Sequence, residues 1–363
     1  MFTSSRLTTA RKRRGLTKKH LAESAGISDK ILTAYEKGGA IPSPETLDAL
    51  SHALNFPVEF FSGSDIIELA PQSASFRALT TLPAFKRDSA LAAGELATLL
   101  ESWISNRFNL PNAAIPDMRG YDPEIAAEAL RAEWSLGQSP IKNMIHLLES
   151  RGVRVFSLPS KDSEVDAFCF WRGKTPFMLL NVTKSAERSR FDAAHELGHL
   201  VLHQHGKCQG RDTELEADRF ASAFLMPKAT IIAAGKSHLT IESFIKLKKN
   251  WNVSVAALNH RMHSLGLVSD WLYHRFCIEI SERGYRKTEP SSIAHEVPQI
   301  FSKVFNALKE AGINRHDLGR DLHIHADEVN SLVFGLLLAS LPGGRASEEK
   351  RTSSPNLRLV QIE

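Results

Sequence analysis

The sequence predicts a mainly α-helical protein with one small β-sheet. Apolar residues recur at helical spacing along most of the 363-residue chain, and capping residues, glycines and prolines interrupt the pattern. Runs rich in β-branched and aromatic residues, which favour strands, are confined to residues 153–158, 167–171 and 177–182. A chain of this length is expected to form two or three domains.

Composition limits the classes of protein that need to be considered. The chain is 42% hydrophobic and 24% charged, as in an ordinary soluble globular protein. Its three cysteines, Cys169, Cys208 and Cys277, are far apart and form no C-x-x-C pair, which favours a reducing compartment over a disulfide framework. No apolar run follows the early arginines, and the most apolar stretch, residues 332–341, is about half as long as a membrane span. We therefore expect a cytoplasmic protein with no membrane partner.

Positive charge collects at the start of the chain, although the net charge of +4 is mild. Three helices are predicted in residues 1–63: one near residues 4–14, one that begins after the N-cap Thr17 and one that begins after the N-cap Ser28. Gly26 lies between the last two, where a left-handed residue is needed. This order predicts a helix-turn-helix domain. Seven basic residues precede the first acid, Glu23: Arg6, Arg11, Lys12, Arg13, Arg14, Lys18 and Lys19.

Residues 16–55 resemble the Xre/Cro-type helix-turn-helix family through the patterns L-x-x-x-A-G-I-S and Y-E-x-G and the apolar spacing after Pro42. The resemblance implies a double-stranded DNA operator as partner and a homodimer as the binding form. The start of a recognition helix faces base edges, whereas basic residues around it meet phosphates. A three-helix interaction module that binds no DNA is the alternative. We expect base contacts from Ser28, Asp29, Lys30 and Thr33, and phosphate contacts from Thr17, Lys18 and Arg13.

Residues 64–115 are predicted to be a connector followed by an amphipathic helix at 83–108. That helix could be a spacer, a dimerisation surface or a packing partner of the next domain. The next domain, residues 116–270, should contain two helices, three strands and further helices. Glycine and lysine at 173–174 predict a turn between the second and third strands.

An H-E-x-x-H run lies on the predicted helix that follows the strands. His195 and His199 are four residues apart and therefore share one helix face. A zinc ion at about 2.0–2.1 Å from each ring nitrogen can bridge them, and Glu196 is then placed to accept a proton from water. Surface histidines on an amphipathic helix are the structural alternative.

A second amphipathic helix with three acidic residues follows, and Pro227 ends it. Glu214 and Asp218 are four residues apart and share a face, whereas Glu216 points about 200° away from Glu214. We therefore interpret Glu214 as the third metal ligand, Asp218 as a carboxylate that orients a ligand histidine, and Glu216 as a solvated charge. His203 is about 12 Å along the helix axis from His195, which is too far for one ion.

The segments AHELGHLVLH and ELEADRFASAFLMP resemble the ImmA/IrrE family of metallopeptidases almost letter for letter. The resemblance implies a zincin-like α+β domain with a gluzincin-like site, in which His195, His199 and Glu214 are ligands and Glu196 is the base. It implies zinc as cofactor, with manganese as the alternative.

The remainder is predicted to be helical. Residues 271–342 include a pattern that resembles a degenerate helix-turn-helix without a basic cluster, which favours an adaptor or dimerisation role. Residues 343–363 are polar and rich in glycine and serine, and we predict disorder there.

Two classes of function are consistent with these features. The first is a DNA-binding regulator whose zinc endopeptidase domain cleaves a repressor-type protein, or the chain itself, in response to a signal. The second is a transcription factor whose metallopeptidase fold serves only as a sensor or dimerisation platform. An antitoxin of a toxin–antitoxin or prophage pair, with a toxin encoded nearby, is a further alternative.

Overall fold

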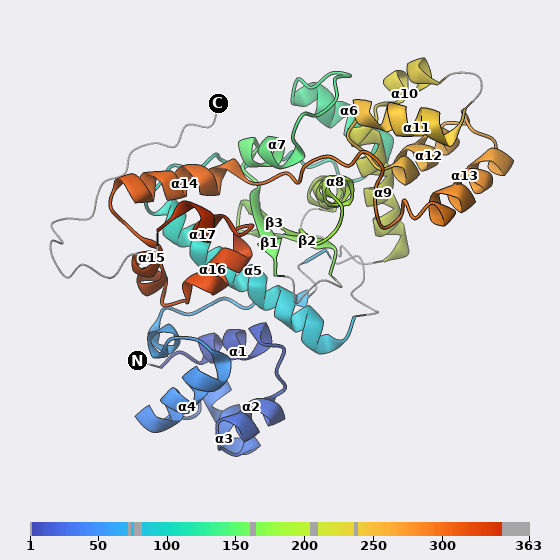
Figure 1. The fold of residues 1–363 in the computed structure, drawn as a ribbon. Coiled ribbons are helices and arrows are strands. Elements are labelled where there is room, and N and C mark those ends of the chain that lie inside the picture. Colours follow the sequence, from blue (N-terminus) through green and yellow to red (C-terminus); the bar gives the residue numbers. More distant parts are fainter. Residues whose placement is uncertain are drawn as a thin grey trace.

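A computed structural model describes residues 2–71, 74–75, 82–159, 165–203, 210–235 and 239–342. It is mainly helical and contains one three-stranded sheet, as predicted (Figure 1). Among these residues no helix is both long enough and apolar enough to cross a membrane. The predicted disordered tail lies outside the described residues.

The first domain is the predicted helix-turn-helix. The Thr17 hydroxyl accepts a hydrogen bond from the backbone of His20, and the Ser28 hydroxyl accepts one from Ile31, so both predicted N-caps are confirmed. Gly26 has a φ of +67°, which explains the glycine in the turn. The elements are α1 (Ser4–Arg13), α2 (Lys18–Ser24), α3 (Asp29–Glu36), α4 (Pro44–Leu54) and the 3₁₀ helix η1 (Val58–Ser62).

The sheet has the strand order β1-β3-β2, so β2 is an edge strand. Strand β3 pairs in parallel with β1 and antiparallel with β2, and Gly173, with a φ of +58°, lies in the predicted turn between β2 and β3. The bounds are β1 (Arg154–Leu158), β2 (Ala167–Arg172) and β3 (Thr175–Asn181).

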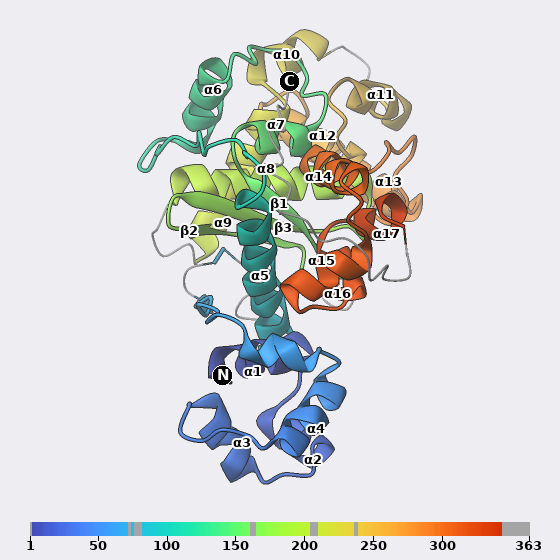
Figure 2. The ribbon, with the colours of Figure 1, turned by 90° about the vertical axis from the view of Figure 1, so that its left-hand side faces the viewer.

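The sheet separates two hydrophobic cores because side chains alternate between its faces. Phe168 and Phe170 enter one core, and Ala167 and Cys169 enter the other. The first core is continuous from the helix-turn-helix domain through α5 (Ala84–Ser105) to the C-terminal helices. Figure 2 shows α5 extending from the helix-turn-helix domain to the sheet. The helix at 83–108 is therefore a packing partner, one of the three roles considered for it.

The second core contains the helices on the other side of the sheet. There α8 (Ala186–Leu202) packs on β2 and β3, and α9 (Arg211–Leu225) packs on α8 (Figure 1). Further helices contribute side chains to this core: α6 (Pro123–Glu133), α7 (Met144–Ser150), α10 (Lys228–Ala234), α11 (Ile241–Leu247), α12 (Val255–Ser264) and α13 (Asp270–Glu282). The 3₁₀ helix η4 (Lys248–Asn250) follows α11.

The C-terminal helices join the first core rather than the second. This segment packs beside α5 and β1, and its Glu328 forms ion pairs with Arg13 and Arg14 of the helix-turn-helix domain (Figure 2). The elements are α14 (Gln299–Glu310), α15 (Arg315–Leu322), α16 (Ala326–Leu332) and α17 (Leu336–Ser340).

Candidate metal centre

Helix α8 carries the H-E-x-x-H residues in a buried position. His195, Glu196 and His199 are only 2%, 2% and 1% exposed, because the sheet covers one side of the helix and α9 covers another. Gly198 permits the close approach of α9. A Cβ atom at this glycine would lie 3.1 Å from the Phe220 ring and 3.2 Å from the Ala217 Cα. The glycine of the motif thus brings the second helix into reach of the histidines.

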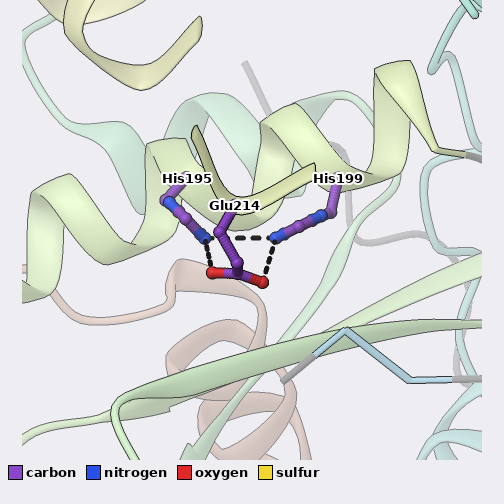
Figure 3. Close-up of side chains that lie close together, drawn as sticks. All are labelled: His195, His199 and Glu214. Atoms are coloured by element: carbon purple, nitrogen blue, oxygen red, sulfur yellow. Dashed lines mark hydrogen bonds and ion pairs between the residues drawn. The ribbon is translucent and has the colours of Figure 1, made fainter. Parts of the chain in front are cut away.

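Three potential ligand atoms converge between the two helices (Figure 3). The Nε2 atoms of His195 and His199 are 3.1 Å apart. Glu214 Oε2 lies 3.3 Å from His195 Nε2, and Glu214 Oε1 lies 3.4 Å from His199 Nε2. Ligands about 2.0–2.1 Å from a tetrahedral zinc ion are about 3.3 Å from each other. The three separations, two of which involve different oxygens of Glu214, are close to this spacing. Beyond its 3.3 Å contact with the His195 ring, the buried Glu214 Oε2 has no hydrogen-bond partner among the described residues, which fits an atom whose partner is a cation.

Both histidines are oriented through their other ring nitrogen. His195 Nδ1 lies 2.8 Å from Asp218 Oδ1, in the arrangement predicted for Asp218. His199 Nδ1 lies 3.0 Å from His203 Nδ1, and His203 Nε2 lies 2.8 Å from Glu216 Oε2. The prediction of Glu216 as a solvated charge is therefore incomplete. Its side chain is 48% exposed, yet it contacts the ring at the end of α8, a contact that the helical wheel of α9 alone could not reveal.

The electrostatics suit cation binding. Burial by itself raises the pKa of Glu214, but the adjacent His195 and His199 rings lower that pKa to about 2. Glu214 is therefore anionic at neutral pH, as a metal ligand must be. Burial by itself lowers the pKa of His195, but its bonds with Asp218 and Glu214 raise it to about 9. A metal ion must therefore displace a proton from His195.

Glu196 contacts a residue that the sequence did not single out. Its Oε2 atom accepts a 2.5 Å hydrogen bond from the hydroxyl of Ser75. Ser75 lies in the predicted connector, more than a hundred positions before α8, and no local pattern distinguishes it from the other serines there.

The outer partners should control metal affinity. We expect Asp218→Asn to weaken zinc binding about 10–100-fold, because His195 loses the carboxylate that fixes its ring. Asp212→Asn, the same change at an exposed position of α9, should have no effect. Competition with a chromophoric chelator measures both affinities. Equal affinities for the two variants would remove Asp218 from this role.

The predicted DNA contacts fall into two groups. Ser28, Asp29 and Lys30 are exposed at the start of α3, and Thr33 is half-buried one turn later. Thr17 is exposed at the start of α2. These positions are accessible to a ligand, and their contacts with DNA remain predictions.

Lys18 and Arg13 already have protein partners. Lys18 Nζ lies 3.2 Å from Glu36 Oε2 while its side chain is 41% exposed. Arg13 is 5% exposed, and its Nε donates to Glu328 Oε1 at 2.5 Å. The expectation that Arg13 contacts a phosphate is therefore corrected, because the partner that buries it comes from α16, far along the chain.

Comparison with known proteins agrees with both halves of this description. Residues 148–263 match the peptidase family described as the IrrE N-terminal-like domain, and this range includes α8, α9 and the three candidate ligands. Residues 7–61 match a helix-turn-helix family. A search of curated proteins finds no match to the chain. The chain thus joins an Xre-type helix-turn-helix domain to an ImmA/IrrE-type metallopeptidase domain.

Proposed function

We propose that the protein is a DNA-binding regulator whose central domain is a zinc-dependent endopeptidase. The observation that carries the proposal is the cluster of the buried His195 and His199 with the half-buried Glu214, and the buried Glu196 next to it on α8. A scaffold or sensor needs the metal ligands at most. It has no physical need for a carboxylate base buried beside them.

The residues divide the chemistry between them. His195, His199 and Glu214 would hold zinc, or manganese as the alternative. The bound ion would polarise the scissile carbonyl and make water more acidic. Glu196 accepts the proton of the attacking water and passes it to the leaving amine. Asp218 and His203 keep the ligand rings oriented.

The substrate that we propose is a repressor-type protein, cleaved in response to a signal. Two features support a polypeptide substrate in a gene-control setting. The β2 strand is at the sheet edge next to α8, where an extended peptide can add main-chain hydrogen bonds. The helix-turn-helix domain shares a continuous core with that same sheet, so a bound operator would lie on the same folded unit as the peptidase domain. A homodimer on the operator remains part of the proposal.

Replacement of the base tests this function. A proteome-derived peptide library is incubated with the protein and zinc, and mass spectrometry measures the rate of cleavage. The two parent chains are the wild type and Ser75→Ala, which lacks the hydroxyl that hydrogen-bonds Glu196. We expect Glu196→Gln, introduced into each, to lower the rate at least about 100-fold while the zinc content stays the same. Glu128→Gln, on the exposed face of α6, is the matched control.

Two outcomes would refute the endopeptidase. One is the absence of zinc-dependent cleavage by both parent chains. The other is cleavage that persists at the same rate after Glu196→Gln. If, in addition, reporter regulation in cells does not respond to Glu196→Gln, the metallopeptidase fold acts as a sensor or dimerisation platform.

A further inference from the structure

Two residues of the connector between the domains lie along the edge of β2 that does not pair with β3. Ala74 forms an antiparallel bridge with Phe170, and the backbone N–H of Ser75 donates to the Cys169 carbonyl at 3.0 Å. Ala74 and Ser75 are 0% and 1% exposed. They therefore occupy the edge on which an extended peptide substrate would pair.

The Ser75 side chain reaches the base itself. Its hydroxyl donates to Glu196 Oε2 at 2.5 Å and accepts from the Cys169 N–H at 3.0 Å. One hydroxyl thus joins the edge strand to the residue that must receive the proton of water. The group in contact with the base is a side chain rather than a peptide carbonyl, so it offers no bond to cleave.

The same connector is tied to the helix-turn-helix domain. Glu95 of α5 accepts a hydrogen bond from the Leu69 N–H at 2.9 Å through Oε1 and one from the Thr9 hydroxyl of α1 at 2.6 Å through Oε2. Glu95 is 2% exposed. Gly94 leaves room for the connector, since a Cβ there would lie 3.1 Å from both Leu69 and Phe170. The connector at Leu69 and helix α1 therefore share one buried carboxylate.

We propose that Ala74–Ser75 inhibits the peptidase in cis by occupying the peptide-binding edge of β2 and the base Glu196. This inference rests on the proposed endopeptidase function and concerns the regulation of the same site. A substrate must displace the segment. It should therefore be an extended peptide with small residues at the two positions that Ala74 and Ser75 fill. Because Glu95 holds both the connector and α1, movement of the helix-turn-helix domain loosens the segment.

A reversible disulfide tests the occupancy directly. Ser75 Oγ lies 3.1 Å from Cys169 Sγ, so Ser75→Cys places two thiols side by side. Diamide accepts the two hydrogens of these thiols, and the disulfide locks the segment on the edge. The readout is the affinity of the zinc-loaded protein for a fluorescein-labelled peptide hydroxamate, which requires the metal and the edge but no turnover.

We expect the 75–169 cross-link to form and to weaken probe binding at least 10-fold, and reduction to restore the binding. In Ser75→Cys/Cys169→Ser, diamide should not change the affinity. Ser75→Ala should bind the probe about 10-fold more tightly than the wild type, and Ser62→Ala, at an exposed serine before the segment, should bind like the wild type.

Three results would overturn the inference: no cross-link, a cross-linked chain that binds the probe as well as the reduced chain, or wild-type protein that cuts its own 74–75 bond. None of them depends on cleavage of a partner protein. If probe binding follows the lock but no peptide is ever cleaved, the proposed endopeptidase fails and the occupancy of the edge stands.

Discussion

Glu214→Ala is expected to lower zinc affinity about 10³-fold. Structural zinc sites in zinc-finger peptides gain about 10–16 kcal/mol from their ligands, and on that scale the loss of one ligand among three removes about 4 kcal/mol. Glu214 contributes the negative charge of the set, and its pKa of about 2 keeps that charge at neutral pH. Competition with chelators of graded affinity measures the change.

Glu216→Ala is the matched control, since it removes a carboxylate two residues further along the same helix. Glu216 contacts His203 rather than the ligand triangle, so its loss should change zinc affinity less than 10-fold. A larger effect from Glu216 than from Glu214 would mean that the wrong face of α9 had been assigned to the metal.

The metal centre was predictable because it depends on short-range geometry. The period of an α-helix places His195 and His199 on one face of α8, and it places Glu214 and Asp218 on one face of α9, whatever the rest of the fold does. The structure adds the approach of the two helices, which Gly198 permits. The spacing of the acids therefore singled out a carboxylate, the candidate third ligand, that lies within 3.4 Å of both rings.

Features that depend on long-range packing were not predictable. Ser75 reaches Glu196 only because the connector crosses the edge of β2, and a strand pairing of this kind leaves no periodic pattern in two residues. Arg13 looked like a DNA contact because it lies in a basic cluster. The local sequence cannot distinguish a basic residue whose buried acidic partner lies 315 positions away from a basic residue that faces solvent.

Glu328→Ala is expected to destabilise the fold by about 3–5 kcal/mol. The Glu328 carboxylate is 8% exposed and binds Arg13 at 2.5 Å and Arg14 at 2.6 Å, so its removal leaves a buried guanidinium without its carboxylate. Glu310→Ala, an exposed acid on α14, should change stability by less than about 0.5 kcal/mol. Denaturant unfolding monitored by circular dichroism gives both values.

The acid limb of the stability profile should change as well. Burial alone raises the pKa of Glu328, but Arg13 and Arg14 lower it below its ordinary value. A lowered pKa in the folded state means that the stabilisation is complete above the unfolded pKa of about 4.3 and is lost as pH falls through the folded value. Glu328→Ala should therefore flatten the loss of stability below about pH 4. An unchanged slope would show that the pair does not titrate with unfolding.

Stability and operator binding of Arg13→Ala together separate a structural role of Arg13 from a role in DNA binding. If Arg13 serves the contact with α16, Arg13→Ala should reduce stability and leave the salt dependence of operator binding unchanged, provided that binding is measured where the variant is folded. A residue that meets a phosphate behaves differently, because its removal lowers the slope of log K against log salt by about 1. Lys30→Ala, at an exposed position of α3, should alter operator affinity with little loss of stability. A reduced salt slope for Arg13→Ala would mean that α1 leaves α16 when DNA binds, which would connect operator binding to the segment that covers Glu196.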